Sequence, residues 1–203
     1  MSLDHEQEVI DRREAIKRVS VLLGGVALVG GSGLLASCGR ERPPAGTAVG
    51  KFSGTDVALL DEVADTILPE TKTPGAKAAK VGPFMALMVT DCYDAKDQEI
   101  FRSGMAKLEA ASTKMNGKSF MDSTPAQRTA LLESLDKEQK AYMEGKTEDQ
   151  RAHYFRMMKE LTLLGYFTSE IGYTKAMRYR EAPGHYDPCV DYKPGETSWA
   201  PHA

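Results

Sequence analysis

The sequence is poor in the side chains that usually carry chemistry. Its 203 residues include three cysteines, four histidines and one tryptophan. It has no Cys-x-x-Cys-His motif to attach a c-type haem and no Gly-x-Gly-x-x-Gly after a strand to bind a dinucleotide, and its cysteine and histidine spacings do not match a zinc site. The formal net charge of −3 lacks the basic excess typical of nucleic-acid binding. We therefore expect no catalytic, cofactor or metal site on this chain.

The polar residues that remain do not form a catalytic pattern. His153 stands alone on a predicted helix, where a packed or exposed histidine is commoner than a ligand. An enzyme built on Glu170, His185 or Asp187 is the weakest hypothesis, because the sequence places no nucleophile or second carboxylate beside them. Several of the ten methionines fall at helical positions, which indicates core packing rather than a methionine copper site; these are Met85, Met88, Met105, Met157 and Met158.

The first 37 residues have the pattern of an export signal. Arg12 and Arg13 stand side by side, with Lys17 shortly after them, directly ahead of an apolar run over residues 19–36. Adjacent arginines before a weakly hydrophobic, glycine-rich segment are typical of a twin-arginine signal, which exports proteins that have already folded. The alternative is a permanent membrane anchor, since the run has about 18 residues, the lower limit for a span. Its five glycines disfavour a stable spanning helix.

The end of this segment predicts a lipid anchor. Leu35-Ala36-Ser37-Cys38 resembles a lipobox, in which Cys38 becomes the lipidated N-terminus; an ordinary cleavage site beside an unmodified thiol is the alternative. Residues 38–52 follow as a flexible tether. In an oxidising periplasm Cys92 and Cys189 form a disulfide within the chain, bond to another chain or remain thiols, and two cysteines do not decide between these alternatives.

Residues 53–179 have a helical pattern nearly throughout. Caps, apolar periodicity and breakers predict six helices. The first is capped by Ser53-Gly54-Thr55 and ended by Pro69, the second begins near residues 81–83, and the third spans 94–111 before a break at Asn116-Gly117. The fourth starts at Ser123-Thr124-Pro125 with Tyr142 facing inward, the longest begins near residue 147 and passes Gly165, and the last runs over 168–177. We therefore expect an all-α fold, a compact bundle of about five or six helices.

After Tyr179 the sequence becomes rich in proline and aromatic residues. Such a segment is too rich in proline for a helix and too aromatic for a solvated tail. We therefore expect residues 180–203 to be extended and to lie against either the chain's own bundle or a partner subunit, where Tyr and Trp are enriched. The residues predicted to contact a partner are Tyr166, Phe167, His185, Tyr186, Tyr192 and Trp199.

Five blocks along the chain resemble the small subunit of gluconate 2-dehydrogenase, the subunit 3 family. Asp65-Thr66-Ile67-Leu68-Pro69 and Pro183-Gly184-His185-Tyr186-Asp187 enclose blocks at residues 73–81, 88–93 and 159–172. The resemblance covers most of residues 55–200, and blocks in this order are specific. The twin-arginine start is similar to the family as well. Only some members have a lipobox, so the lipid anchor depends on its own residues.

The resemblance implies a non-catalytic subunit that holds no cofactor itself. Its partner would be a large FAD-dependent oxidoreductase of the glucose–methanol–choline type, acting on a sugar, sugar acid or glycoside, with a cytochrome c as electron acceptor. That partner would fold around FAD in the cytoplasm, dock on this chain and reach the periplasm through the twin-arginine translocase. In some members a cysteine bonds to the large subunit, a role that Cys92 or Cys189 would take here. A stand-alone lipoprotein that acts as a binding or scaffold module is the alternative function.

Overall fold

The computed structural model describes residues 48–182, 184–185 and 189–200. The chain divides into two units, Met1–Glu41 and Arg42–Ala203, and every described residue belongs to the second unit. Arg12, Arg13, Lys17 and Cys38, which carry the predicted export signal and lipidation site, lie outside the described residues, as does Tyr186.

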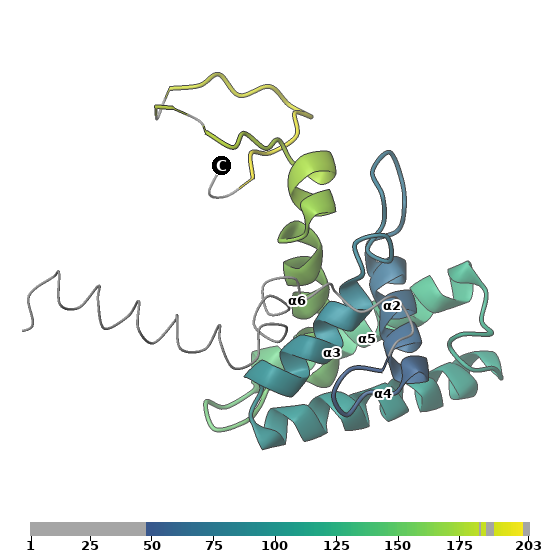
Figure 1. Ribbon diagram of the computed structural model, residues 1–203. Helices are drawn as coiled ribbons and strands as arrows, with labels where there is room; N and C mark the ends of the chain where they lie inside the picture. Colours follow the sequence, from purple (N-terminus) through teal and green to yellow (C-terminus); the bar gives the residue numbers. More distant parts are fainter. Residues whose placement is uncertain (1–47, 183, 186–188, 201–203) are drawn as a thin grey trace, which may run out of the picture. The chain divides into compact units, whose positions relative to one another are not determined.

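The described chain is helical, with no strand among its residues, which confirms the all-α prediction (Figure 1). The elements are α2 Gly54–Ile67, α3 Val81–Cys92, α4 Ala95–Asn116, α5 Pro125–Gly145, α6 Tyr154–Phe167 and the π-helix η1 Gly172–Ala176. Helix α6 contacts all four described α-helices that precede it. Its buried residues Phe155, Met158 and Leu161 therefore lie at the centre of the core.

Local sequence signals set three helix starts as predicted. Ser53 caps α2 in a reciprocal capping box with Asp56. Asp94 caps α4 through the Asp97 N–H, and Thr124 caps α5 with Pro125 in its first turn. Each cap satisfies backbone N–H groups that the helix itself leaves without an acceptor.

The methionines that fall at helical positions in the sequence lie in or against the core, as predicted. Met85, Met105, Met157 and Met158 are buried and Met88 packs half-buried against them. The buried methionines belong to the same core cluster as Phe101 and Phe155, which supports core packing as their role.

The predicted helix from residue 147 is wrong in its start. Helix α6 begins only at Tyr154 and has 14 residues, fewer than α4 with 22. Residues 147–150 form a turn instead, in which the Gln150 N–H donates to the Thr147 carbonyl at 3.1 Å. Arg151 then pairs with Asp94 at 2.8 Å and Asp97 at 3.0 Å. These ion pairs hold the chain against the start of α4, so the helix begins after them.

The predicted inward position of Tyr142 is also wrong, because this side chain is 40% exposed. Its hydroxyl donates to the Arg151 carbonyl at 3.1 Å, and its ring lies 5.5 Å from that of His153. Tyr142 therefore covers the segment before α6 from outside.

A hydrogen-bonded turn at Ser169 joins the end of α6 to η1. The Ser169 hydroxyl donates to the Tyr166 carbonyl at 2.6 Å and accepts from the Gly172 N–H at 3.0 Å. The last predicted helix follows this cap as the single π-helical segment η1. A Cβ on Gly172 would lie 2.0 Å from the Tyr166 carbonyl oxygen, so no larger residue fits the turn.

Candidate partner interface

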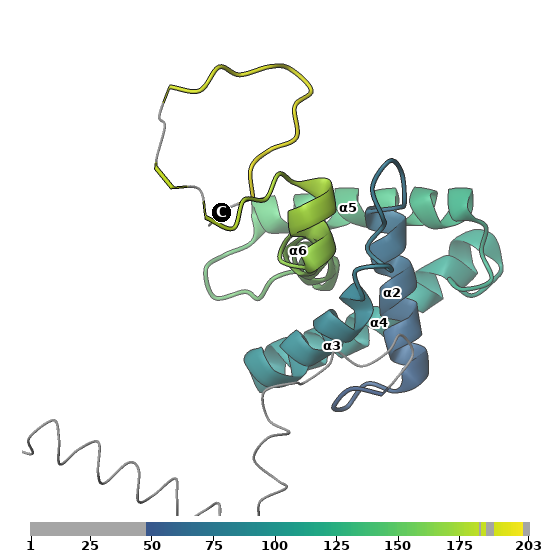
Figure 2. The ribbon, with the colours of Figure 1, turned by 45° about the horizontal axis from the view of Figure 1, so that its top comes forward.

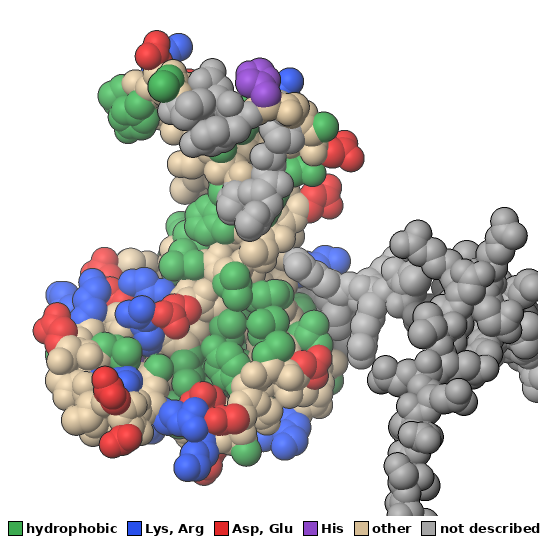
Figure 3. Space-filling view, turned by 90° about the vertical axis from the view of Figure 1, so that its left-hand side faces the viewer, with side chains coloured by type: hydrophobic (Ala, Val, Ile, Leu, Met, Phe, Trp, Pro, Cys, Tyr) green, Lys and Arg blue, Asp and Glu red, His purple; other side chains and the backbone are tan. Residues whose placement is uncertain are grey.

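Exposed hydrophobic side chains gather toward the C-terminal end of the described chain. Of its ten large exposed hydrophobic residues, seven fall in one stretch: Leu163, Leu164, Phe167, Tyr179, Val190, Tyr192 and Trp199. We call the described residues from Leu163 to Ala200 the head; it comprises the end of α6, η1 and the tail. Figure 3 shows it rising from the helical bundle. Large exposed apolar areas of this kind mark interaction sites.

The head contains most of the residues predicted to contact a partner. Phe167 is 38% exposed, Trp199 52% and Tyr192 81%, and His185 is exposed as well. Tyr166 requires a correction, because only 4% of it is exposed. Its hydroxyl donates to the Pro74 carbonyl at 2.7 Å, so it fastens the loop between α2 and α3 to α6. Burial and this internal bond give Tyr166 a structural role.

The tail does not lie on the chain's own bundle. Every described residue from Tyr179 to Trp199 is exposed. Figures 1 and 2 show the tail leaving the end of η1 as an open loop and returning to the same place. The described aromatic side chains of the tail, Tyr192 and Trp199, thus remain largely exposed, which favours the partner alternative.

A second apolar surface adjoins the head along α3. Phe84, Leu87 and Met88 are half-buried there. Phe84 packs on Gly165 of α6 so closely that an added Cβ would come within 2.5 Å of its ring. Figure 3 shows hydrophobic side chains gathered below the head on this side of the bundle. The apolar area of the head therefore continues onto the bundle.

His153 is committed to the fold. It is the N-cap of α6, where its Nδ1 accepts from the Phe155 N–H at 3.3 Å. Burial lowers the pKa of its imidazole, against the smaller opposing effect of Glu138, whose carboxylate lies 3.5 Å from Nε2. A histidine that caps a helix with one nitrogen and faces a carboxylate with the other is a structural residue.

Asp61 is a second titratable group used for structure. It is 1% exposed on α2, and its Oδ1 accepts from the Gly82 N–H at 2.8 Å. Lys80, the N-cap residue of α3, has a left-handed backbone (φ 55°) and makes no side-chain cap. Asp61 therefore caps α3 from the neighbouring helix, and burial raises the pKa of its carboxyl.

The described part of the chain contains no metal-ligating cluster. No three His, Cys, Asp or Glu side chains in the described ranges are placed to hold a metal ion. Glu170 and His185 are both exposed, and Asp187 lies outside the described residues. Charged and apolar side chains together line a groove of about 630 Å³ between α2 and α4. Ser103 carries the one hydroxyl of this lining, and that hydroxyl donates to the Ile100 carbonyl at 3.1 Å.

The two cysteines of the described chain are exposed, and no disulfide joins Cys92 to Cys189 within it. The Cys92 thiol lies 3.9 Å from the Met88 sulfur at the end of α3. A bond from either cysteine to another chain stays a prediction. Within the described ranges, every helix is too short or too polar to cross a bilayer.

Sequence reasoning missed several residues of the head, above all Leu163, Leu164 and Arg178. A signal for the two leucines was available. Leu161, Gly165 and Tyr166 already supply the buried stripe of α6, so two further leucines between them widen the apolar surface beyond what the core uses.

A family model described as gluconate 2-dehydrogenase subunit 3 matches residues 55–184, which is more than half of the chain. The match runs from the first turn of α2 through η1 and into the tail. Searches of curated proteins and of solved structures found no match.

Proposed function

This chain belongs to the gluconate 2-dehydrogenase subunit 3 family, and from that premise we propose that it is the non-catalytic small subunit of a periplasmic, FAD-dependent dehydrogenase complex. Its partner is a large oxidoreductase of the glucose–methanol–choline type, which holds FAD and oxidises a sugar, sugar acid or glycoside. A cytochrome c accepts the electrons. The small subunit supplies the export signal and supports the folding and stability of the large one.

The observation that carries this proposal is the uncovered head. Seven large hydrophobic residues are exposed between Leu163 and Trp199, and Tyr166 is the only residue of this segment that belongs to the buried hydrophobic core cluster of the described chain. Leaving such side chains in water is unfavourable by about 25 cal/mol for each Å² of apolar surface. A subunit whose partner covers this surface gains that free energy on assembly.

The predicted export signal supports the same function. The twin-arginine route suits cargo that folds around a cofactor before export, yet this sequence has no cofactor motif. A partner that binds FAD in the cytoplasm and leaves on this chain's signal resolves the mismatch. Lipidation at Cys38 would then tether the complex to a membrane.

The test is purification of the tagged full-length chain from membranes of its native host. We expect a yellow complex with an FAD absorbance spectrum and a large oxidoreductase in near-equal amount. A colourless single species from freshly solubilised membranes would refute the proposal and support a stand-alone lipoprotein.

Export provides an independent readout. Replacing Arg12 and Arg13 together by lysine should retain both this chain and the flavoprotein in the cytoplasm. The matched control is the same double replacement at Arg40 and Arg42, which lie beyond the predicted signal. Normal export of both proteins by the Arg12/Arg13 variant would contradict the signal assignment.

A further inference from the structure

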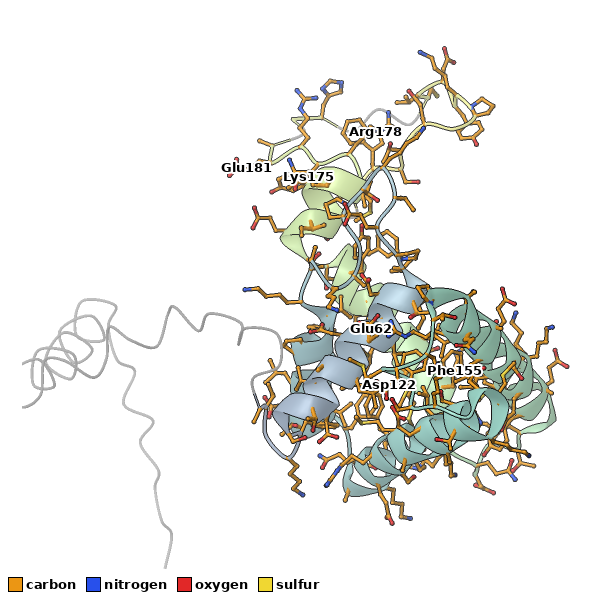
Figure 4. The ribbon with its side chains drawn as sticks, turned by 90° about the vertical axis from the view of Figure 1, so that its right-hand side faces the viewer. Glu62, Asp122, Phe155, Lys175, Arg178 and Glu181 are labelled. Carbon is orange, nitrogen blue, oxygen red and sulfur yellow. The ribbon has the colours of Figure 1, made fainter. Side chains whose placement is uncertain are left out.

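The tail is closed by a contact between its two ends. Arg178 and Trp199 form a parallel bridge, in which the Arg178 N–H donates to the Ser198 carbonyl and the Ala200 N–H donates to the Arg178 carbonyl, both at 2.8 Å. The Arg178 guanidinium carbon lies 4.5 Å from the centroid of the Trp199 ring, a cation–π distance. Glu196 adds an ion pair to Arg178 at 3.5 Å. We call this set of contacts the clasp; Figure 4 shows Arg178 where the tail meets the end of η1.

A tight turn precedes the segment of the tail that returns to Arg178. The Glu196 N–H donates to the Lys193 carbonyl at 3.1 Å, and Gly195 has a φ of 83°. A type II turn requires a positive φ at its third position, which favours glycine, and proline is common at its second position. Pro194-Gly195 therefore directs the chain back so that Trp199 reaches Arg178.

The clasp adds little buried hydrophobic surface to the described chain. Beyond Tyr166, the only buried hydrophobic residue of the described chain is Ala200. The clasp nevertheless opposes the entropy of a loop of about twenty residues, which otherwise samples many conformations. A structure that restrains a segment without contributing to the core lowers the entropy lost when that segment binds.

We propose that the Arg178–Trp199 clasp holds the tail in its binding conformation, so that the head docks on the catalytic flavoprotein subunit as a preformed surface. The proposal deepens the proposed function and rests on it. The flavoprotein is the occupant because the chain belongs to a family of dehydrogenase subunits and because the exposed aromatic residues lie on the segment that the clasp restrains. Arg178 and Trp199 act as positioning residues for Val190 and Tyr192.

The test compares Arg178→Ala, Trp199→Ala and the double variant of the full-length chain. Each is reassembled with the flavoprotein subunit separated from the wild-type complex, and the Kd is measured. We expect each single variant to raise Kd about tenfold, the effect of losing one partly desolvated cation–π contact. The double variant should show about the same loss as either single variant, because each opens the same clasp.

Two further measurements separate restraint from direct contact. Amide hydrogen exchange over residues 178–200 of the isolated chain should accelerate in both single variants, while helix content stays constant. Trp199→Tyr, which keeps an aromatic face for the guanidinium, should recover most of the affinity. Met115→Ala, a matched control at a residue that is 54% exposed outside the head, should leave Kd unchanged.

The outcomes distinguish the two proposals. A wild-type chain that brings no flavoprotein with it refutes the proposed function and the clasp together. A complex that forms, but with unchanged Kd in the single variants, with additive losses in the double variant or with unchanged exchange, overturns the clasp alone.

Discussion

Replacing Gly172 by alanine should disable the head and leave the bundle folded. The added Cβ would lie 2.0 Å from the Tyr166 carbonyl oxygen and 2.9 Å from Phe167 Cα, whereas real Cβ atoms essentially never approach closer than 3.0 Å. Both obstacles are backbone atoms, so the turn must open. Opening it breaks the bond from the Gly172 N–H to Ser169 at 3.0 Å and the bond from the Met177 N–H to the Gly172 carbonyl at 2.9 Å.

The magnitude follows from these contacts. Two hydrogen bonds contribute about 1 kcal/mol each, and overpacking at a rigid site costs about 1–3 kcal/mol. The closed turn is therefore disfavoured by about 3–5 kcal/mol in the variant. If docking requires the closed turn, Kd for the proposed flavoprotein partner should rise at least tenfold, since each 1.4 kcal/mol is about a factor of ten.

The assay pairs this Kd with a thermal melt of the isolated chain. The melting temperature should change little, because nearly all buried hydrophobic residues precede Gly172. Gly145→Ala is the matched control, since nothing lies within 4 Å of its added Cβ. Wild-type affinity in the Gly172 variant would refute the argument that this turn orients the head.

Three further tests concern the bundle, each read from urea unfolding. His153→Asn keeps a cap acceptor but cannot titrate. Burial lowers the pKa of His153 below 6.5, so its contribution to the free energy of unfolding is present above pH 6.5 and is lost as the pH falls below that value. The wild type should therefore lose more stability than the variant from pH 8 to 5. Burial raises the pKa of Asp61 above 3.8, so its contribution to the free energy of unfolding is present below pH 3.8 and is lost as the pH rises through the raised value. Asp61→Asn should therefore gain stability relative to wild type from pH 4 to 7. A stability difference between the two proteins that stays constant over this range would contradict the argument. Arg128→Ala removes a largely buried partner of Glu62 and should cost about 2–3 kcal/mol; a loss under about 0.5 kcal/mol would show that the pair contributes little.

The helix starts that were predicted correctly depend on neighbours in sequence. Ser53 with Asp56, and Thr124 with Gln127, form their capping boxes within three residues, so the pattern is visible in the chain itself. The start of α6 was missed because its cause is distant. Arg151 is held by Asp97, which lies 54 residues earlier, and no local pattern reveals that ion pair.

The same distinction applies to the candidate interface. Aromatic residues and prolines in the tail predicted a surface-bound segment, and Phe167, Tyr192 and Trp199 are exposed as an interface requires. The burial of Tyr166 was missed because its hydrogen bond reaches Pro74, 92 residues away. The clasp was missed because closure of the tail depends on the position of η1.

The core and the head differ in how far their side chains are buried, and this difference makes the head the part to test. Core residues from Val49 to Tyr166 bury their side chains against one another, and their caps and ion pairs agree with that packing. The head departs from this consistency, since Leu163, Leu164, Phe167 and the exposed aromatic residues of the tail face solvent on either side of a turn that only glycine permits. A sequence usually departs from a self-sufficient fold where function requires it. For a chain of a subunit family, the physical requirement that best explains such a departure is a second protein covering the head.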